Sequence, residues 1–84
     1  MPLISEFLGI KIYMYWEDDM PPHFHVQYGG DKAIIVIRTG EMLAGHLPPS
    51  ILREVKAWRD RHVAELDENW MLCQRAQSPK KITP

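Results

Sequence analysis

The stretch His23-Phe24-His25-Val26-Gln27-Tyr28-Gly29-Gly30-Asp31 decides the fold of this chain of 84 residues. Side chains on an extended strand alternate between its two faces. One face here is apolar and should face the core, and the other should be the more accessible to solvent. The two sets are Phe24, Val26 and Tyr28, and His23 and His25. Since Gly29-Gly30-Asp31 has the composition of a hairpin turn, we predict a strand over residues 23–28 that ends in a tight turn.

The segments on either side of this strand also have the composition of strands. Residues 9–16 alternate, and residues 33–37 are apolar at successive positions, which predicts a strand covered on both faces. Residues 41–44 suggest a short fourth strand. Short turns between consecutive strands favour an antiparallel meander. The apolar face of residues 9–16 is formed by Ile10, Ile12, Met14 and Trp16.

After Gly45 the apolar period changes from two residues to about 3.6, which is typical of a helix. Pro48-Pro49-Ser50 suits a helix start, with Ser50 as a candidate N-cap. The apolar stripe consists of Ile51, Val55, Trp58, His62, Leu66, Trp70 and Cys73. The pattern fits one long helix or two helices that meet near residues 60–64.

The predicted fold class is therefore α+β, with a three- to four-stranded antiparallel meander followed by one long or two short helices packed on one face. We expect residues 1–84 to form a single domain, strand-rich over 1–45 and helical over 48–76. The tail over residues 77–84 should fray.

Composition and charge limit the function classes. The formal net charge of -1 offers no basic excess, so an RNA partner remains an alternative that the charge does not support. A single cysteine, Cys73, excludes an internal disulfide, and we expect it to be a half-buried structural residue. No apolar run approaches the ~20 residues needed to cross a bilayer, so we expect a cytoplasmic protein without a membrane partner.

His23 and His25 are the residues best suited to chemistry. Two imidazoles on one strand face could chelate a divalent metal, with a carboxylate from the acidic loop, Asp18 in particular, as a third ligand. The same pair could act as general acid and base on a phosphodiester, as in a metal-independent ribonuclease. A third alternative is that the histidines only pack against tyrosines and bond backbone carbonyls. These residues leave open whether the protein is an enzyme, and they identify no cofactor.

Other polar and aromatic residues are explained most simply by structure. His62 lies in the apolar stripe and should pack on the sheet. The acidic run Glu17-Asp18-Asp19 is most simply a solvated loop, with metal ligation or docking of a basic partner as alternatives. Core packing explains the three tryptophans, and the alternative is an exposed anchor for a partner.

The sequence resembles the DUF4160 family, a bacterial domain of unknown function, over essentially its whole length. The most specific segment of the resemblance is Pro21-Pro22-His23-Phe24-His25. The other matching segments are residues 4–10, Met14-Tyr15, Asp18, Tyr28-Gly29, Gly45-His46-Leu47-Pro48, Trp58, His62, Glu65-Leu66, Asn69-Trp70 and Lys81-Ile82. The resemblance implies a small prokaryotic protein often encoded beside another small protein and discussed as half of a toxin–antitoxin pair.

These observations together favour a cytosolic protein-interaction module, which acts as the toxin-like half of a two-protein system. Its partner would be the small protein encoded nearby, and a homodimer is a further alternative. The competing hypotheses are a ribonuclease or a metal-binding domain, each of which would use His23 and His25. The resemblance supplies no catalytic residues.

Overall fold

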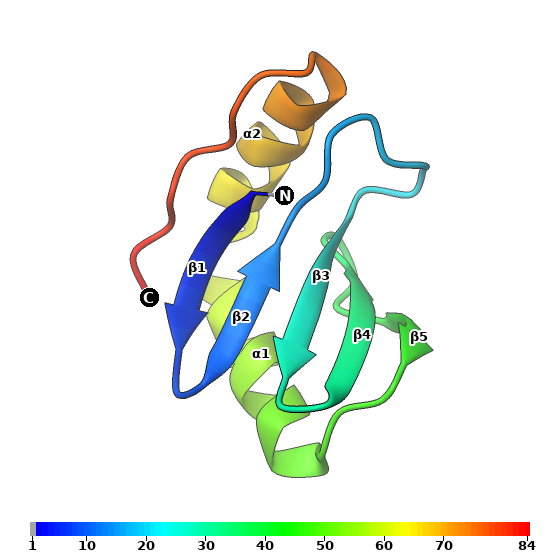
Figure 1. The fold of residues 1–84 in the computed structure, drawn as a ribbon, viewed down its shortest axis with the longest axis vertical. Helices are drawn as coiled ribbons and strands as arrows, with labels where there is room; N and C mark the ends of the chain where they lie inside the picture. Colours follow the sequence, from blue (N-terminus) through cyan, green and yellow to red (C-terminus); the bar gives the residue numbers. More distant parts are fainter. Residues whose placement is uncertain (1) are drawn as a thin grey trace.

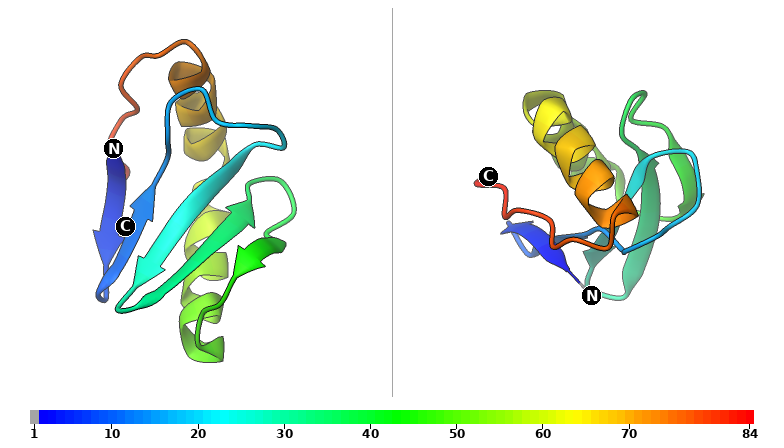
Figure 2. Two further views of the ribbon diagram at one scale, coloured as in Figure 1. Left: turned by 45° about the vertical axis from the view of Figure 1, so that its right-hand side comes forward. Right: turned by 90° about the horizontal axis from the view of Figure 1, so that it is seen from above.

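The computed structural model describes residues 2–84, which form one antiparallel sheet with two helices on one of its faces (Figures 1 and 2). Each strand pairs with the next along the chain, so the sheet is a five-stranded meander. The elements are β1 (Leu3–Phe7), β2 (Ile10–Tyr13), β3 (His23–Tyr28), β4 (Asp31–Val36), β5 (Met42–Gly45), α1 (Pro49–Arg61) and α2 (Val63–Gln74).

The predicted α+β class, the antiparallel meander and the helices that follow it are confirmed, but the sheet has five strands rather than three to four. The strand missed from the sequence is β1. Its alternation is interrupted by an irregularity between Leu3 and Ser5. Ser5 is buried and donates a hydrogen bond from Oγ to the carbonyl of Ile82. A polar residue at a core-facing position interrupts the alternation of apolar and polar residues from which strands are predicted.

The alternation of β2 and β3 directs one face of the sheet into the core, as predicted. Ile10, Ile12 and Phe24 are fully buried, and Val26 is nearly so. Trp16 does not follow this pattern, since β2 ends at Tyr13 and Trp16 lies outside the sheet with 52% of its surface exposed. The period of two therefore extends one residue past β2, to fully buried Met14, and fails at Trp16.

The apolar run in β4 is covered mainly on one face. Ile35 is fully buried toward the helices, whereas Ile34 points to the other face and is only half-buried. Both helices lie on one side (Figure 2), and the second face of the sheet is open at Ile34, although His23 and Val36, which pair on that face, are buried. The predicted cover on both faces is therefore incomplete at Ile34.

The helical half contains two helices, which meet at His62 inside the predicted interval. His62 leaves helical geometry, with φ −130° and ψ 22°, while its ring packs on Trp58 and its Nδ1 lies 2.6 Å from Oε1 of Glu65. The break comes from tertiary packing, since no Gly or Pro is present there. The N-cap prediction is wrong: α1 begins at Pro49, and its N-cap is Pro48 rather than Ser50.

The apolar stripe packs on the sheet. Its buried members are Val55, Trp58, Leu66, Trp70 and Cys73. Cys73 is fully rather than half buried, and burial raises the pKa of its thiol, which suits a packing residue rather than a nucleophile. Neither helix among residues 2–84 combines the length and hydrophobicity that a bilayer span requires.

The C-terminal tail runs beside β1 (Figure 1), and residues 80–82 are held in place. Ile82 is buried and donates its backbone N–H to the carbonyl of Ile4. The amide of Asn69 both accepts from the N–H of Lys80 and donates to its carbonyl. The expectation of a frayed tail over 77–84 therefore does not describe these residues, whose partners lie far away in the sequence.

We predict that Gly45→Ala lowers the free energy of unfolding by at least about 2 kcal/mol, because its φ of +90° is strained for any other residue. A Cβ there would also lie 2.0 Å from the backbone oxygen of Lys32. Gly30→Ala is the matched control, since nothing lies within 4 Å of its Cβ position. Urea unfolding followed by circular dichroism measures both, and equal midpoints would contradict the close approach of β5 to β4.

Candidate functional site

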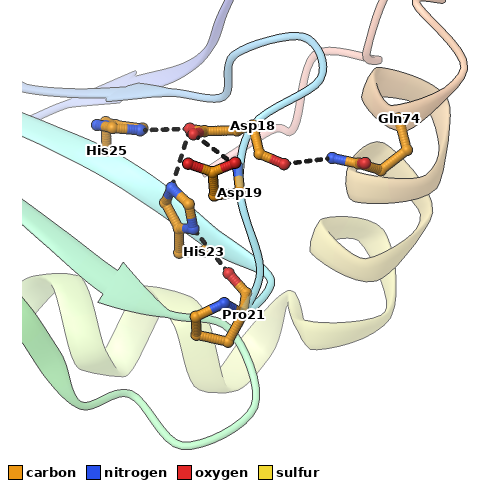
Figure 3. A network of polar contacts seen from close by, with 6 residues as sticks. All are labelled: Asp18, Asp19, Pro21, His23, His25 and Gln74. Carbon is orange, nitrogen blue, oxygen red and sulfur yellow. Dashed lines mark hydrogen bonds and ion pairs between the residues drawn. The ribbon is translucent and has the colours of Figure 1, made fainter.

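The candidate site lies where the loop between β2 and β3, residues 14–22, returns to the sheet (Figure 3). β3 contributes His23 and His25, which share a face because they are two residues apart on a strand. The loop contributes Asp18, whose carboxylate lies between the two imidazoles in Figure 3. The structure thus brings together the three residues that the sequence singled out as candidate metal ligands.

One carboxylate oxygen faces both histidines. Oδ2 of Asp18 lies 2.9 Å from Nε2 of His23 and 3.0 Å from Nε2 of His25. The two imidazole rings are 5.1 Å apart between centroids. The three side chains each offer one ligand atom, and all three atoms lie within 4.8 Å of one another.

The hydrogen bond made by Nδ1 of His23 determines whether Nε2 of the same ring carries a proton. Nδ1 of His23 lies 2.7 Å from the carbonyl oxygen of Pro21, which can only accept a hydrogen bond, so Nδ1 carries a proton. In a neutral imidazole the other nitrogen, Nε2, is then a lone-pair acceptor. That lone pair points at the oxygen of Asp18, another acceptor. The contact is favourable only when a proton or a cation occupies the space between them.

The loop that carries Asp18 is held by α2. The backbone N–H of Glu17 donates to the carbonyl of Cys73 over 3.1 Å, and Nε2 of Gln74 donates to the carbonyl of Asp18 over 3.0 Å. The N–H of Asp19 donates to Oδ1 of Asp18 itself. Gln74 was not identified from the sequence, because it is 56 residues away and no local pattern connects it to the loop.

The three side chains differ in exposure. His23 is buried, with 6% of its surface exposed, so the predicted accessible position is wrong for this residue. The ring of Trp70 lies 5.3 Å from it and covers it from α2. The side chains of Asp18 and His25 each keep about a quarter of their surface exposed. The cluster is thus closed on the His23 side and open to solvent on the side of Asp18 and His25.

The carboxylate of Asp18 is stabilised in its ionised form. Partial burial alone would raise its pKa, but the hydrogen bond from His25, that from the backbone of Asp19, and the charge and hydrogen bond of His23 together lower it. The net pKa lies below the ordinary value of 3.8. At neutral pH the site therefore contains an anionic oxygen ligand beside two imidazole nitrogens.

A groove of about 300 Å³ opens on the helix-free face of the sheet and includes His25 in its wall. Its polar and aromatic lining comes from Tyr13, Tyr15, Gln27 and Lys32. The alternative in which the histidines pack against tyrosines is confirmed for His25, whose ring lies 4.3 Å from that of Tyr15 between centroids. Strand register also places Tyr13 beside His25, since the two residues pair across β2 and β3.

The remaining candidates lie outside the cluster. His62 packs on Trp58 of α1 and bonds Glu65 of α2, so its contacts lie within the helical half rather than on the sheet as predicted. Trp58 and Trp70 are core residues, whereas Trp16 is exposed. Of the three acidic residues in the loop, only Asp18 belongs to the group of candidate metal ligands.

Residues 9–71 match the family described as Domain of unknown function (DUF4160), and the chain belongs to that family. The matched region contains Asp18, His23 and His25. No curated protein and no solved structure gives a significant match.

We predict that Asp18→Asn, in metal-free protein kept in EDTA, lowers the free energy of unfolding at pH 6 by about 1–2 kcal/mol, because charge-assisted hydrogen bonds are lost. A carboxyl whose pKa is lowered by folding stabilises the fold above its unfolded pKa and loses that effect as pH falls through its folded pKa. The difference between wild type and variant should therefore shrink below pH 3.8.

Urea unfolding at a series of pH values measures this difference. Asp19→Asn is the matched control, since it removes the same charge from the same exposed loop and should change stability by less than about 0.5 kcal/mol. Parallel curves for wild type and Asp18→Asn across the acid range would show that the carboxylate is not stabilised by the histidines.

Proposed function

We propose that this member of the DUF4160 family is a metal-binding domain, with one divalent transition metal held by Asp18, His23 and His25. The observation that carries the proposal is the contact between Nε2 of His23 and Oδ2 of Asp18. With Nδ1 bonded to Pro21, Nε2 of a neutral His23 and Oδ2 of Asp18 both present lone pairs to one small space. A metal cation would satisfy both lone pairs and that of His25 together.

The surroundings of His23 support the same proposal. Histidines that ligate metals generally donate their other ring N–H to a carbonyl or carboxylate, which fixes the tautomer and the orientation of the ring. The bond from Nδ1 of His23 to Pro21 has this form. Trp70 on one side and the strand on the other restrict the ring further. The donor is therefore preorganised before any metal binds.

The donor set indicates which metals to expect. Imidazole nitrogen favours Zn²⁺, Fe²⁺, Ni²⁺ and Cu²⁺ over Mg²⁺ and Ca²⁺, and two histidines with one carboxylate are typical of sites that keep open positions. Structural zinc sites normally have four protein ligands, whereas catalytic sites have three. A metal in this setting activates water for hydrolysis. Asp18 and His25 leave the open side that a water or substrate would need.

The geometry gives less support to the alternative in which His23 and His25 act as a general acid–base pair on RNA. Such a pair needs two free nitrogens on opposite sides of the substrate. Here both Nε2 atoms converge on one oxygen of Asp18, and the other nitrogen of His23 is bonded to Pro21. His23 is also too buried to reach a phosphodiester.

We predict that purified protein binds one equivalent of Zn²⁺ or Co²⁺, as measured by isothermal titration and by the visible absorption of Co²⁺. At a free concentration a hundred times Kd, the metal should raise the free energy of unfolding by about 2.7 kcal/mol. Removal of a residue that only hydrogen-bonds a metal ligand lowers metal affinity about 10–100-fold. His25→Ala removes a ligand itself, so it should lower metal affinity at least about a hundredfold.

His46→Ala is the matched control, because His46 is exposed and does not belong to the ligand group. It should bind metal with unchanged affinity. No binding by the wild-type protein, or an equal loss in His46→Ala and His25→Ala, would refute the metal site.

We also propose a protein-interaction role, in which the small protein encoded beside this one binds at the loop between β2 and β3. The supporting observation is the exposure of two large apolar side chains that flank Asp18, Trp16 at 52% and Met20 at 72%. Tryptophan is enriched among the residues that dominate binding energy at interfaces. The toxin-like role in a two-protein system depends on this proposed binding of the neighbouring protein to the loop.

Co-expression of the two proteins followed by size-exclusion chromatography tests this second proposal. We expect a single complex, and Trp16→Ala should weaken it by about 30-fold, the effect of a 2 kcal/mol hot spot. Leu8→Ala is the control, since Leu8 is a large apolar residue that is 71% exposed near the opposite end of β2. Separate monomer peaks would exclude the complex, and a peak of doubled mass without the neighbour would indicate the homodimer instead.

A further inference from the structure

The helix-free face of the sheet has two cross-strand rows of side chains beside the metal ligands. Tyr13, His25, Ile34 and Ala44 form the first row, since these residues pair in register across β2, β3, β4 and β5. Gln27 and Lys32 pair in the next row. These rows and Tyr15 line the groove of about 300 Å³.

The chemistry of the groove changes along its length. At one end His25 belongs both to the groove and to the ligand group with Asp18. At the same end half-buried Tyr13 and Ile34 flank His25 in its row and form an apolar and aromatic wall. At the other end Gln27 and Lys32 provide an amide and a cation. Diagonal neighbours on a sheet are about 7–8 Å apart, which is the expected separation of His25 from Lys32.

We propose that this groove binds a small organic anion, with its body against Tyr13 and Ile34, its anionic group at Lys32 and its other end beside the metal. This inference rests on the metal-binding function proposed above. A groove of about 300 Å³ is at the lower end of the range for small-molecule sites, which suits a ligand the size of one substituted ring. Pockets of this size, apolar with a few polar groups at fixed places, are typical of small-molecule sites.

The charge at Lys32 selects an anion rather than a neutral ligand. No ion pair involves Lys32 among residues 2–84, so its ammonium is free to meet one. Gln27, opposite Lys32 on β3, can donate an amide N–H to the same group. The two aromatic rings of Tyr13 and Tyr15 lie nearly parallel, with 5° between their planes, and favour a planar body.

Isonicotinate is a suitable probe, since it has nine heavy atoms with a ring nitrogen and a carboxylate at opposite ends. Its neutral amide, isonicotinamide, is the matched ligand control. Titrations followed by ¹H–¹⁵N NMR on Zn²⁺-loaded protein should shift the backbone signals of Gln27, Lys32 and Ile34. Lys32→Gln should weaken isonicotinate about threefold to fivefold, the effect of a partly exposed ion pair, and should leave isonicotinamide unchanged.

Two further variants separate the groove from the metal site. Lys11→Gln removes a charge from the same face, where Lys11 pairs with Gln27 from the other side but does not line the groove. It should leave both ligands unaffected. Ala44→Trp should fill the groove and abolish the isonicotinate shifts while Zn²⁺ affinity stays within twofold.

The outcomes distinguish failure of the groove from failure of the metal site. If Zn²⁺ binds but isonicotinate shifts no groove signal, or if Lys11→Gln and Lys32→Gln weaken it equally, the groove proposal is overturned and the metal site stands. If Zn²⁺ does not bind, the metal site fails and the same titration on metal-free protein decides the groove. Groove signals that shift on dilution alone would show that a second copy covers this face, which also overturns the proposal.

Discussion

The alternation of side chains along β3 is the constraint on which both the core and the site depend. Phe24 and Val26 fill the core under the helices, so His23 and His25 must project from the opposite side of the strand. The two helices cover only one face of a five-stranded sheet. The alternation that buries Phe24 and Val26 therefore also places the two imidazoles on the opposite face of the sheet, which no other element covers completely.

The carboxylate reaches this face because a loop is fixed at both ends and in its middle. β2 and β3 pair in register and fix its two ends, while α2 bonds the backbone of Glu17 and of Asp18 near its own C-terminal end. Trp70, from the same helix, packs on His23. The helix thus positions both the loop and one ligand, which ties the geometry of the site to the packing of the helical half.

The sequence predicted the parts of this molecule that depend on local periodicity. β3, its hairpin and the core positions of β2 follow from patterns within a few residues, whereas the sequence left open whether the helical half breaks near residue 62. The missed features depend on contacts between distant segments. β1 was missed because one of its core positions is the polar Ser5, whose hydrogen bond to Ile82 cannot be read from the sequence. The C-terminal tail has its hydrogen-bond partners in β1 and α2.

The same distinction holds within the site. Alternation alone predicted that His23 and His25 share a face, and their neighbourhood to the acidic loop suggested Asp18. The burial of His23 could not be predicted, since Trp70 covers it from 47 residues further along the chain. The groove also required knowledge of strand register, because Tyr13, Ile34 and Ala44 meet His25 only through pairing across four strands.

A proton and a metal ion would compete for one space in this cluster. Nδ1 of His23 holds its proton against Pro21 in either state, so only the Nε2 positions change occupant. Asp18 contributes little to that competition, since its lowered pKa leaves it ionised at neutral pH. The ionised Asp18 reduces the free-energy cost of loading, because it does not have to change its state when the cation enters, and the bond from Nδ1 of His23 to Pro21 keeps that ring oriented.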